Sequence, residues 1–248
     1  MIQRRHVTPA IVLLGVAAAC WAITAQRMQG MDMGPGTPLG GLGWFAVVWV
    51  TMMAAMMLPS LLPMAITHSR ASSAAGAPSP TAAASVFAGG YLLVWAGAGV
   101  FAYVVFDGVR SLDLSWLAWN QGGRYIAGGV ILAAALYELT PAKLTCLRHC
   151  RDPDLLSDRW RPGVPGAFLT GLEHGGFCVG SGWALMAVLF AIGVMNVSWM
   201  VVLAALVAIQ KLLPSDRVAI GATVVFVATL AIAVAFAPHH VPGLTIPG

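Results

Sequence analysis

Methionines gather in one apolar segment of the chain, and their spacing suggests soft-metal chemistry. The segment WVTMMAAMMLPSLLPM carries two pairs of methionines four residues apart and a fifth methionine seven residues after the last of these, namely Met52, Met53, Met56, Met57 and Met64. Residues four apart share a helical face, and thioether sulfur favours Cu(I) over hard cations. Because methionine also fills packed cores well, metal contact and packing both stay open for this run.

A second group of methionines lies in the loop that precedes this segment. The stretch MQGMDMG contains Met28, Met31 and Met33, with Asp32 between the last two. Packing explains methionines in a loop less readily than methionines in a helix. Such spacing outside a membrane is similar to the methionine-rich segments of copper-handling proteins, so the two groups together favour metal contact.

Two cysteines and a histidine form a third candidate ligand set, in TPAKLTCLRHCRDP. Thr140 and Pro141 predict the cap and first turn of a short helix, which should run about to Arg151. Cys146 and Cys150 then share one face, with His149 beside them. Two thiolates and an imidazole make a partial site for Zn or Cu(I), short of the four ligands of a structural zinc site.

The segment GLEHGGFCVGSGW adds another candidate pair, His174 and Cys178, four residues apart and next to Glu173. Its glycines clear side chains so that a neighbouring helix can approach closely. A tight helix crossing with an incidental cysteine is therefore the alternative to a metal site. Ser181 between two glycines invites comparison with intramembrane serine proteases. Val179 replaces their glycine, however, and no later helix has an embedded histidine.

Glu138 ends an apolar segment and should seek a cation, because an unpaired buried charge is costly. We expect Lys211 to be its partner, since a hairpin turn at Gly193–Asn196 would return Lys211 to the membrane face of His174 and Cys178. Lys143 lies past the Thr140–Pro141 break and is expected to point away. Without a cation, Glu138 is a candidate metal or proton ligand near Cys146.

The elements that position these residues are membrane helices. Of 248 residues, 59% are hydrophobic and 9% are charged, which excludes a soluble domain of this size. The basic residues lie in loops rather than on one patch, so the net charge of +4 does not indicate nucleic-acid binding. We predict an all-α, polytopic transmembrane helical bundle. It forms a single integral membrane domain over residues 1–248, with a methionine-rich outer loop at 27–43 and a basic Cys/His inner loop at 140–163.

Seven apolar segments are expected to form membrane helices, the first being kept as a helix rather than a cleaved signal. They are Pro9–Gln26, Trp44–Ile66, Ala84–Phe106, Tyr125–Leu139, Gly176–Met195, Ser198–Leu212 and Val218–Ala237. With the N-terminus inside, the inner segments hold ten Lys and Arg residues and the outer segments three. The positive-inside rule therefore predicts an inside N-terminus and an outside C-terminus in a bacterial cytoplasmic membrane, with Ser73 inside and His240 outside.

Several of these motifs in order resemble a bacterial family of predicted metal-binding integral membrane proteins. They are MMAAMMLPS, YELTPAKLTCLRHCRDP, FCVGSGWALM, GVMN and KLLP, and the likeness covers roughly Trp44 to Pro214. The resemblance implies that the cysteines at 146, 150 and 178 and the methionines at 52, 53, 56 and 57 match the pattern. The chain departs from it at Ser181 and Gly182, which replace two adjacent cysteines, and at Gln210, which replaces an acid.

A non-enzymatic protein that handles copper by transfer, sensing or insertion is the preferred interpretation, with zinc as the alternative metal. Methionines from the outer loop into the second apolar segment would form one level of ligands, and the cysteines with His174 a second at the inner face. The expected partners are the lipid bilayer and a membrane or metallochaperone protein, with no nucleic acid. The competing hypotheses are an accessory subunit of a membrane complex and a thiol–disulfide oxidoreductase using Cys146 and Cys150.

Overall fold

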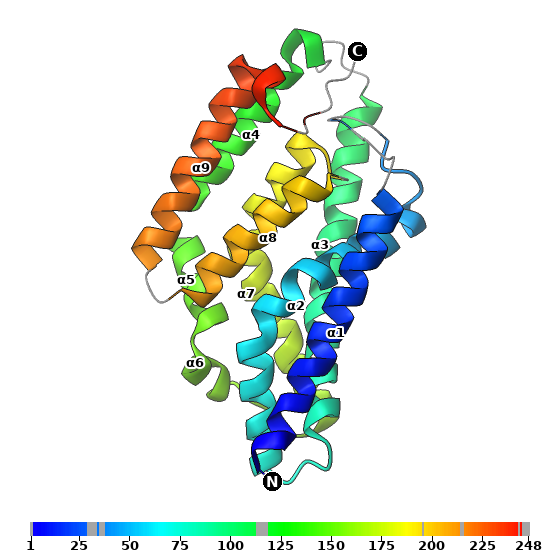
Figure 1. The fold of residues 1–248 in the computed structure, drawn as a ribbon, viewed down its shortest axis with the longest axis vertical. Coiled ribbons are helices and arrows are strands. Elements are labelled where there is room, and N and C mark those ends of the chain that lie inside the picture. The colour runs from blue at the N-terminus through cyan, green and yellow to red at the C-terminus, as the bar shows by residue number, and fades with distance from the viewer. Residues whose placement is uncertain are drawn as a thin grey trace. The chain divides into compact units, whose positions relative to one another are not determined.

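All regular secondary structure of the described residues is helical (Figure 1). This computed structural model describes residues 2–28, 34, 38–112, 119–194, 196–213, 216–242 and 244, the side chains of 2–7 and 216 excepted. Within those residues there is no strand, and nine α-helices follow one another, together with a short π-helix η2 (Trp119–Gly123) and a 3-10 turn η3 (Pro238–His240). The helices are α1 (Ile2–Met28), α2 (Leu42–Ala74), α3 (Pro80–Ser111), α4 (Arg124–Tyr137), α5 (Pro141–Arg151), α6 (Pro153–Ser157), α7 (Gly163–Ile192), α8 (Val197–Leu212) and α9 (Asp216–Phe236).

The predicted class, an all-α polytopic membrane protein, is confirmed. Five of the helices in the described residues are long and apolar enough to cross a membrane, namely α1, α2, α3, α7 and α9. The stretch Trp119–Tyr137 and α5 make a sixth if the pair, bent by 64°, counts as one span. The helix α8, at 16 residues, is shorter than the roughly 20 residues that a membrane crossing requires. Each of the seven predicted segments thus contains a helix, but not all seven reach spanning length.

Two local predictions are confirmed by the helix ends. The helix α5 begins at Pro141, as expected, and Thr140 caps it by accepting a hydrogen bond from the Lys143 backbone N–H at 3.3 Å. The predicted hairpin turn separates α7 from α8. There Gly193 has a φ of 123°, a conformation that residues with a Cβ atom rarely adopt. The Asn196 side chain caps α8 by accepting a hydrogen bond from the Trp199 N–H at 3.1 Å.

The chain folds as two compact units, each built from segments that are distant in the sequence. The first unit comprises residues 1–24, 46–100 and 145–181, and the second comprises 25–45, 101–144 and 182–248. The helices α3 and α7 each supply residues to both units. The single domain over 1–248 stays a prediction.

Glycines set the close helix packing of the first unit, as the sequence predicted for α7. A Cβ atom at Gly175 would lie 3.0 Å from the Tyr91 carbonyl oxygen of α3, and Gly171 lies against the Phe87 carbonyl in the same way. From α3, Gly90 meets the α7 backbone at Phe168. Because no side chain separates the two backbones at these points, the polar and sulfur-bearing residues beside the glycines are drawn into the interior.

The second unit is centred on the pairing of α4 with α9, which lie side by side (Figure 1). Gly128 of α4 permits this approach, since a Cβ atom there would lie 2.9 Å from the Ala235 Cβ of α9. The Trp199 indole N–H at the start of α8 donates to the Pro242 carbonyl at 3.1 Å. This hydrogen bond ties the residues that follow α9 to α8.

Candidate soft-metal site

The cysteines of α5 meet the glycine- and serine-bearing turn of α7 in the first unit. The Cys146 sulfur occupies the space beside Gly180, where an added Cβ atom would lie 2.7 Å from it. One turn further along α5, the Cys150 sulfur lies 3.7 Å from the Ser181 hydroxyl oxygen. Both contacts follow from the predicted face of α5, because cysteines four residues apart lie above one another on a helix.

Cys178 lies on the same part of α7, and a tyrosine of α3 contacts it. Its sulfur is 2.9 Å from the Tyr91 hydroxyl oxygen, and its backbone carbonyl accepts a hydrogen bond from the Ser181 hydroxyl at 3.0 Å. Cys178 and Cys150 are buried and Cys146 is partly so, and none of the three is joined in a disulfide. Three of the predicted ligands therefore lie along one helix crossing, with Ser181 between two of them.

His174 is buried one turn before Cys178 and packs among aromatic rings. Its ring centroid lies 5.6 Å from that of Phe87 and 6.0 Å from that of Tyr91, both on α3. Tyr91 thus contacts both members of the predicted His174–Cys178 pair. We did not predict His68 of α2, which stacks on Phe87 with ring centroids 5.0 Å apart; its spacing of four residues from Met64 is a signal that could have found it.

His149 lies on α5 next to Cys150, and its tautomer follows from one hydrogen bond. Its Nδ1 is 2.8 Å from the Thr145 carbonyl oxygen, so Nδ1 donates this bond, and in a neutral ring Nε2 would hold the lone pair that binds metals. The ring stacks on Phe177, the residue before Cys178, with centroids 4.3 Å apart. His149 is therefore held over the same stretch of α7 as the cysteines.

Glu173 is engaged by arginines of the loop between α6 and α7. Its carboxylate oxygens lie 3.3 Å from an Arg159 nitrogen and 3.5 Å from an Arg161 nitrogen. Arg159 also lies over the Phe177 ring, with its guanidinium carbon 4.7 Å from the centroid. The charge of Glu173 is thus balanced at the partly exposed rim of the site.

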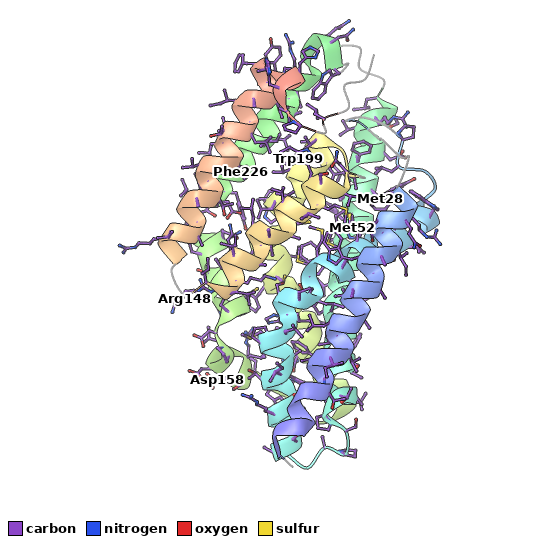
Figure 2. The ribbon with its side chains drawn as sticks, in the orientation of Figure 1. Met28, Met52, Arg148, Asp158, Trp199 and Phe226 are labelled. Carbon is purple, nitrogen blue, oxygen red and sulfur yellow. The ribbon has the colours of Figure 1, made fainter. Side chains whose placement is uncertain are left out.

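All four methionines of the predicted run are buried in the first unit. Met52, Met53 and Met57 have no exposed surface, and Met56 is also buried; Figure 2 labels Met52 on α2. Met28 is buried at the end of α1, in the second unit, while Met31, Met33 and Asp32 lie outside the described residues. A burial this complete shields the thioethers from water, which suits both packing and soft-metal binding.

Glu138 pairs with Lys143, and our expectation that Lys143 points away from it was wrong. The Lys143 Nζ lies 2.7 Å from Glu138 Oε1 and donates to the Gln210 side-chain oxygen at 2.9 Å, while Gln210 Nε2 donates to Glu138 Oε2 at 2.6 Å. The bend of 64° between α4 and α5 turns the first turn of α5 back toward the end of α4. Gln210, which we did not expect here, completes this buried triad, and the predicted contact of Glu138 with Lys211 stays a prediction. Both carboxylate oxygens of Glu138 are thereby hydrogen-bonded.

The donor atoms do not form a preassembled cage. Among the described residues, no group of three or more His, Cys, Asp or Glu side chains is arranged to hold a metal ion. The donor set is still chemically suited to Cu(I), because thiolates, thioethers and imidazoles are ligands that bind it. Cu(I) at the crossing of α5 and α7 would therefore contact fewer than three of these side chains as they stand, or all three thiols after a small rearrangement of side chains.

One comparison with known proteins identifies a family for this chain. Residues 46–234 match the family model PpoB2, which is described as a copper chaperone. The match includes every predicted ligand from Met52 to Cys178. No curated protein and no solved structure was found to match the chain.

Proposed function

We propose a copper-transfer function for this chain, which belongs to the PpoB2 copper chaperone family, and we assign the exchange of Cu(I) to its sulfur ligands. Copper is the cargo in this account. The methionines of α2 hold it weakly, and the cysteines at the crossing of α5 and α7 hold it more tightly. The observation that carries the proposal is the gathering of Cys146, Cys150 and Cys178 on facing turns of two helices.

The chemistry of the donor atoms favours Cu(I) over other metals. Thioethers bind Cu(I) and are poor ligands for zinc and hard cations, whereas thiolates bind both Cu(I) and zinc. A site that used only cysteines would leave zinc as an alternative. The buried methionines in the same unit as the three cysteines support copper instead.

An incomplete ligand set suits a protein that must release its metal. A closed structural site with four ligands contributes to folding, whereas an incomplete set of soft ligands leaves positions open for an incoming ligand. Ser181 and Gly180 lie between the cysteines and supply no strong metal ligand. Cu(I) bound here could therefore pass by ligand exchange to a protein partner.

The loop charges predict how the two groups of ligands are oriented across the membrane. The positive-inside rule predicts that the N-terminus and α5 lie on the cytoplasmic side of a bacterial inner membrane. In that orientation the methionine-rich loop at 27–43 faces outward and the cysteines lie at the inner face. The proposed exchange thus connects two sides of the bilayer within one chain.

A metal titration of the full-length protein tests this function. Reduced protein in lipid nanodiscs would be titrated with Cu(I) against a chromophoric chelator, and in parallel with Zn(II). We expect tight Cu(I) binding that Cys178→Ser weakens at least tenfold. Cys20→Ser is the matched control, since Cys20 lies on α1 and outside the candidate set. Absence of binding for either metal would favour the accessory-subunit hypothesis.

A further inference from the structure

We propose that His68 is a Cu(I) ligand at the end of a line of soft side chains on α2. The line consists of Met53, Met57, Met64 and His68. This inference rests on the proposed copper function and deepens it, because it adds an imidazole to a helix for which only thioethers were predicted. Its evidence is the burial of His68, the spacing of the line, and the aromatic contacts of the ring.

The His68 side chain is buried in a way that ordinary packing does not explain. Only 1% of its surface is exposed, and neither ring nitrogen has a hydrogen-bond partner among the described residues. A neutral imidazole always presents one N–H donor and one lone-pair acceptor. Burial of both without partners costs free energy, and such groups in native proteins call for a specific explanation, for example an ion.

The line consists of two pairs, Met53 with Met57 and Met64 with His68, each four residues apart on α2 and separated by the stretch that holds Pro59 and Pro63. On an ideal helix, positions 53, 57, 64 and 68 fall within an arc of about 60°. All four side chains are at most 2% exposed. Met64 and His68 are four residues apart, so that their side chains are direct neighbours on the helix surface. A thioether beside a neutral imidazole is a donor pair that suits Cu(I).

The surroundings of His68 connect the line to the cysteine site through aromatic contacts within the first unit. Phe87 stacks on the His68 ring and also contacts the His174 ring, which in turn contacts Tyr91. The Tyr91 hydroxyl reaches the Cys178 sulfur. His68 therefore lies where α2 meets α3, whose Phe87 and Tyr91 contact His174 and Cys178 of α7.

The proposed binding involves no change of oxidation state. A lone pair of the neutral imidazole forms a bond to Cu(I), and a thioether of the line supplies the neighbouring bond or leaves the metal. No proton is released, because the ring nitrogen that binds carries none. The copper stays Cu(I) throughout.

The alternative is that His68 is a packing residue against Phe87, and two substitutions separate the possibilities. His68→Phe keeps an aromatic ring on Phe87 but removes both unsatisfied nitrogens. If His68 serves metal binding, the metal-free variant should unfold at the same temperature as the native protein or higher. His68→Met keeps a soft ligand at the same position. His240→Phe is the control, because His240 is exposed in η3.

The test uses the full-length chain in nanodiscs with Cys146, Cys150 and Cys178 all changed to serine. Any Cu(I) that this background still binds is then held by ligands other than these cysteines, such as those of the line. We expect weak Cu(I) binding that falls at least tenfold in His68→Phe and stays within a few-fold in His68→Met. X-ray absorption should show a nitrogen neighbour of copper that both variants lose. Unchanged affinity and an unchanged nitrogen signal in His68→Phe would overturn the proposal.

The failure of this inference is distinguishable from the failure of the proposed function. If the native chain binds Cu(I) through its cysteines but the serine background shows no His68-dependent copper, only the role of His68 is wrong. If the native chain takes up no Cu(I) at all, the proposed copper function fails as well, and His68 is then a packing residue.

Discussion

The Cys150 sulfur lies 3.7 Å from the Ser181 hydroxyl oxygen, on facing turns of α5 and α7. Ser181 also donates to the Cys178 carbonyl, so its hydroxyl is held between two of the three cysteines. Because this position holds a serine, it adds no fourth soft ligand beside Cys150 to the three thiols of the crossing. Its position leads to the first prediction.

Ser181→Cys should raise the affinity for Cu(I) by at least tenfold. The new thiol would lie next to the Cys150 sulfur and add a strong soft ligand to the pair. Chelator competition under reducing conditions measures the gain. In a Cys150→Ser background the gain should shrink, because interacting residues do not contribute additively. An equal gain in both backgrounds would mean that positions 150 and 181 bind copper independently.

Gly180→Ala should displace Cys146 and weaken copper binding. The added Cβ atom would lie 2.7 Å from the Cys146 sulfur, and overpacking of this kind costs about 1–3 kcal/mol. Gly176→Ala on the same helix is the matched control, since nothing lies within 4 Å of an added Cβ there. Thermal unfolding and the alkylation rate of Cys146 would follow the change. Equal behaviour of the two variants would argue against the close contact of α5 with Gly180.

Glu138→Leu should destabilise the protein more than the double change Glu138→Leu with Lys143→Met. The single change leaves a buried ammonium group without its carboxylate, which costs about 3–5 kcal/mol, while Gln210 loses its Glu138 partner in both variants. Arg161→Ala is the control, because its pair with Glu173 is half exposed and such pairs contribute little. Additive losses in a thermal unfolding assay would remove the ion pair from this account.

Residues 75 and 240 should lie on opposite sides of the membrane, the first inside. Ala75 follows α2 in an exposed loop and His240 is exposed in η3. Single cysteines at these positions in a cysteine-free chain would be labelled with an impermeant thiol reagent in intact cells. We expect labelling of position 240 alone. Labelling of both positions would contradict the predicted orientation.

Much of the helix pattern was predictable from sequence because it depends on local chemistry. The Thr140–Pro141 pair indicated where α5 begins, and Gly193 with Asn196 indicated the turn before α8. The shared face of Cys146 and Cys150 followed from their spacing alone. Such features need only the chain near them in sequence.

The partners of polar residues were harder to predict because they depend on how distant helices meet. The direction of the bend after α4 decides that Lys143 reaches Glu138, and no spacing rule gives that direction. Similarly, the burial of His68 against Phe87 depends on the packing of α2 on α3. Tyr91 was missed as a neighbour of Cys178 for the same reason.

The most direct test of the account is the amount of tightly held Cu(I) per chain in single and triple cysteine variants. Full-length protein carrying Cys146→Ser, Cys150→Ser or Cys178→Ser would be compared with the triple variant, each after competition with a strong Cu(I) chelator. If the three thiols act as one site, each single change should remove nearly as much tightly held copper as the triple change. Retention of the native amount by the triple variant would contradict the account.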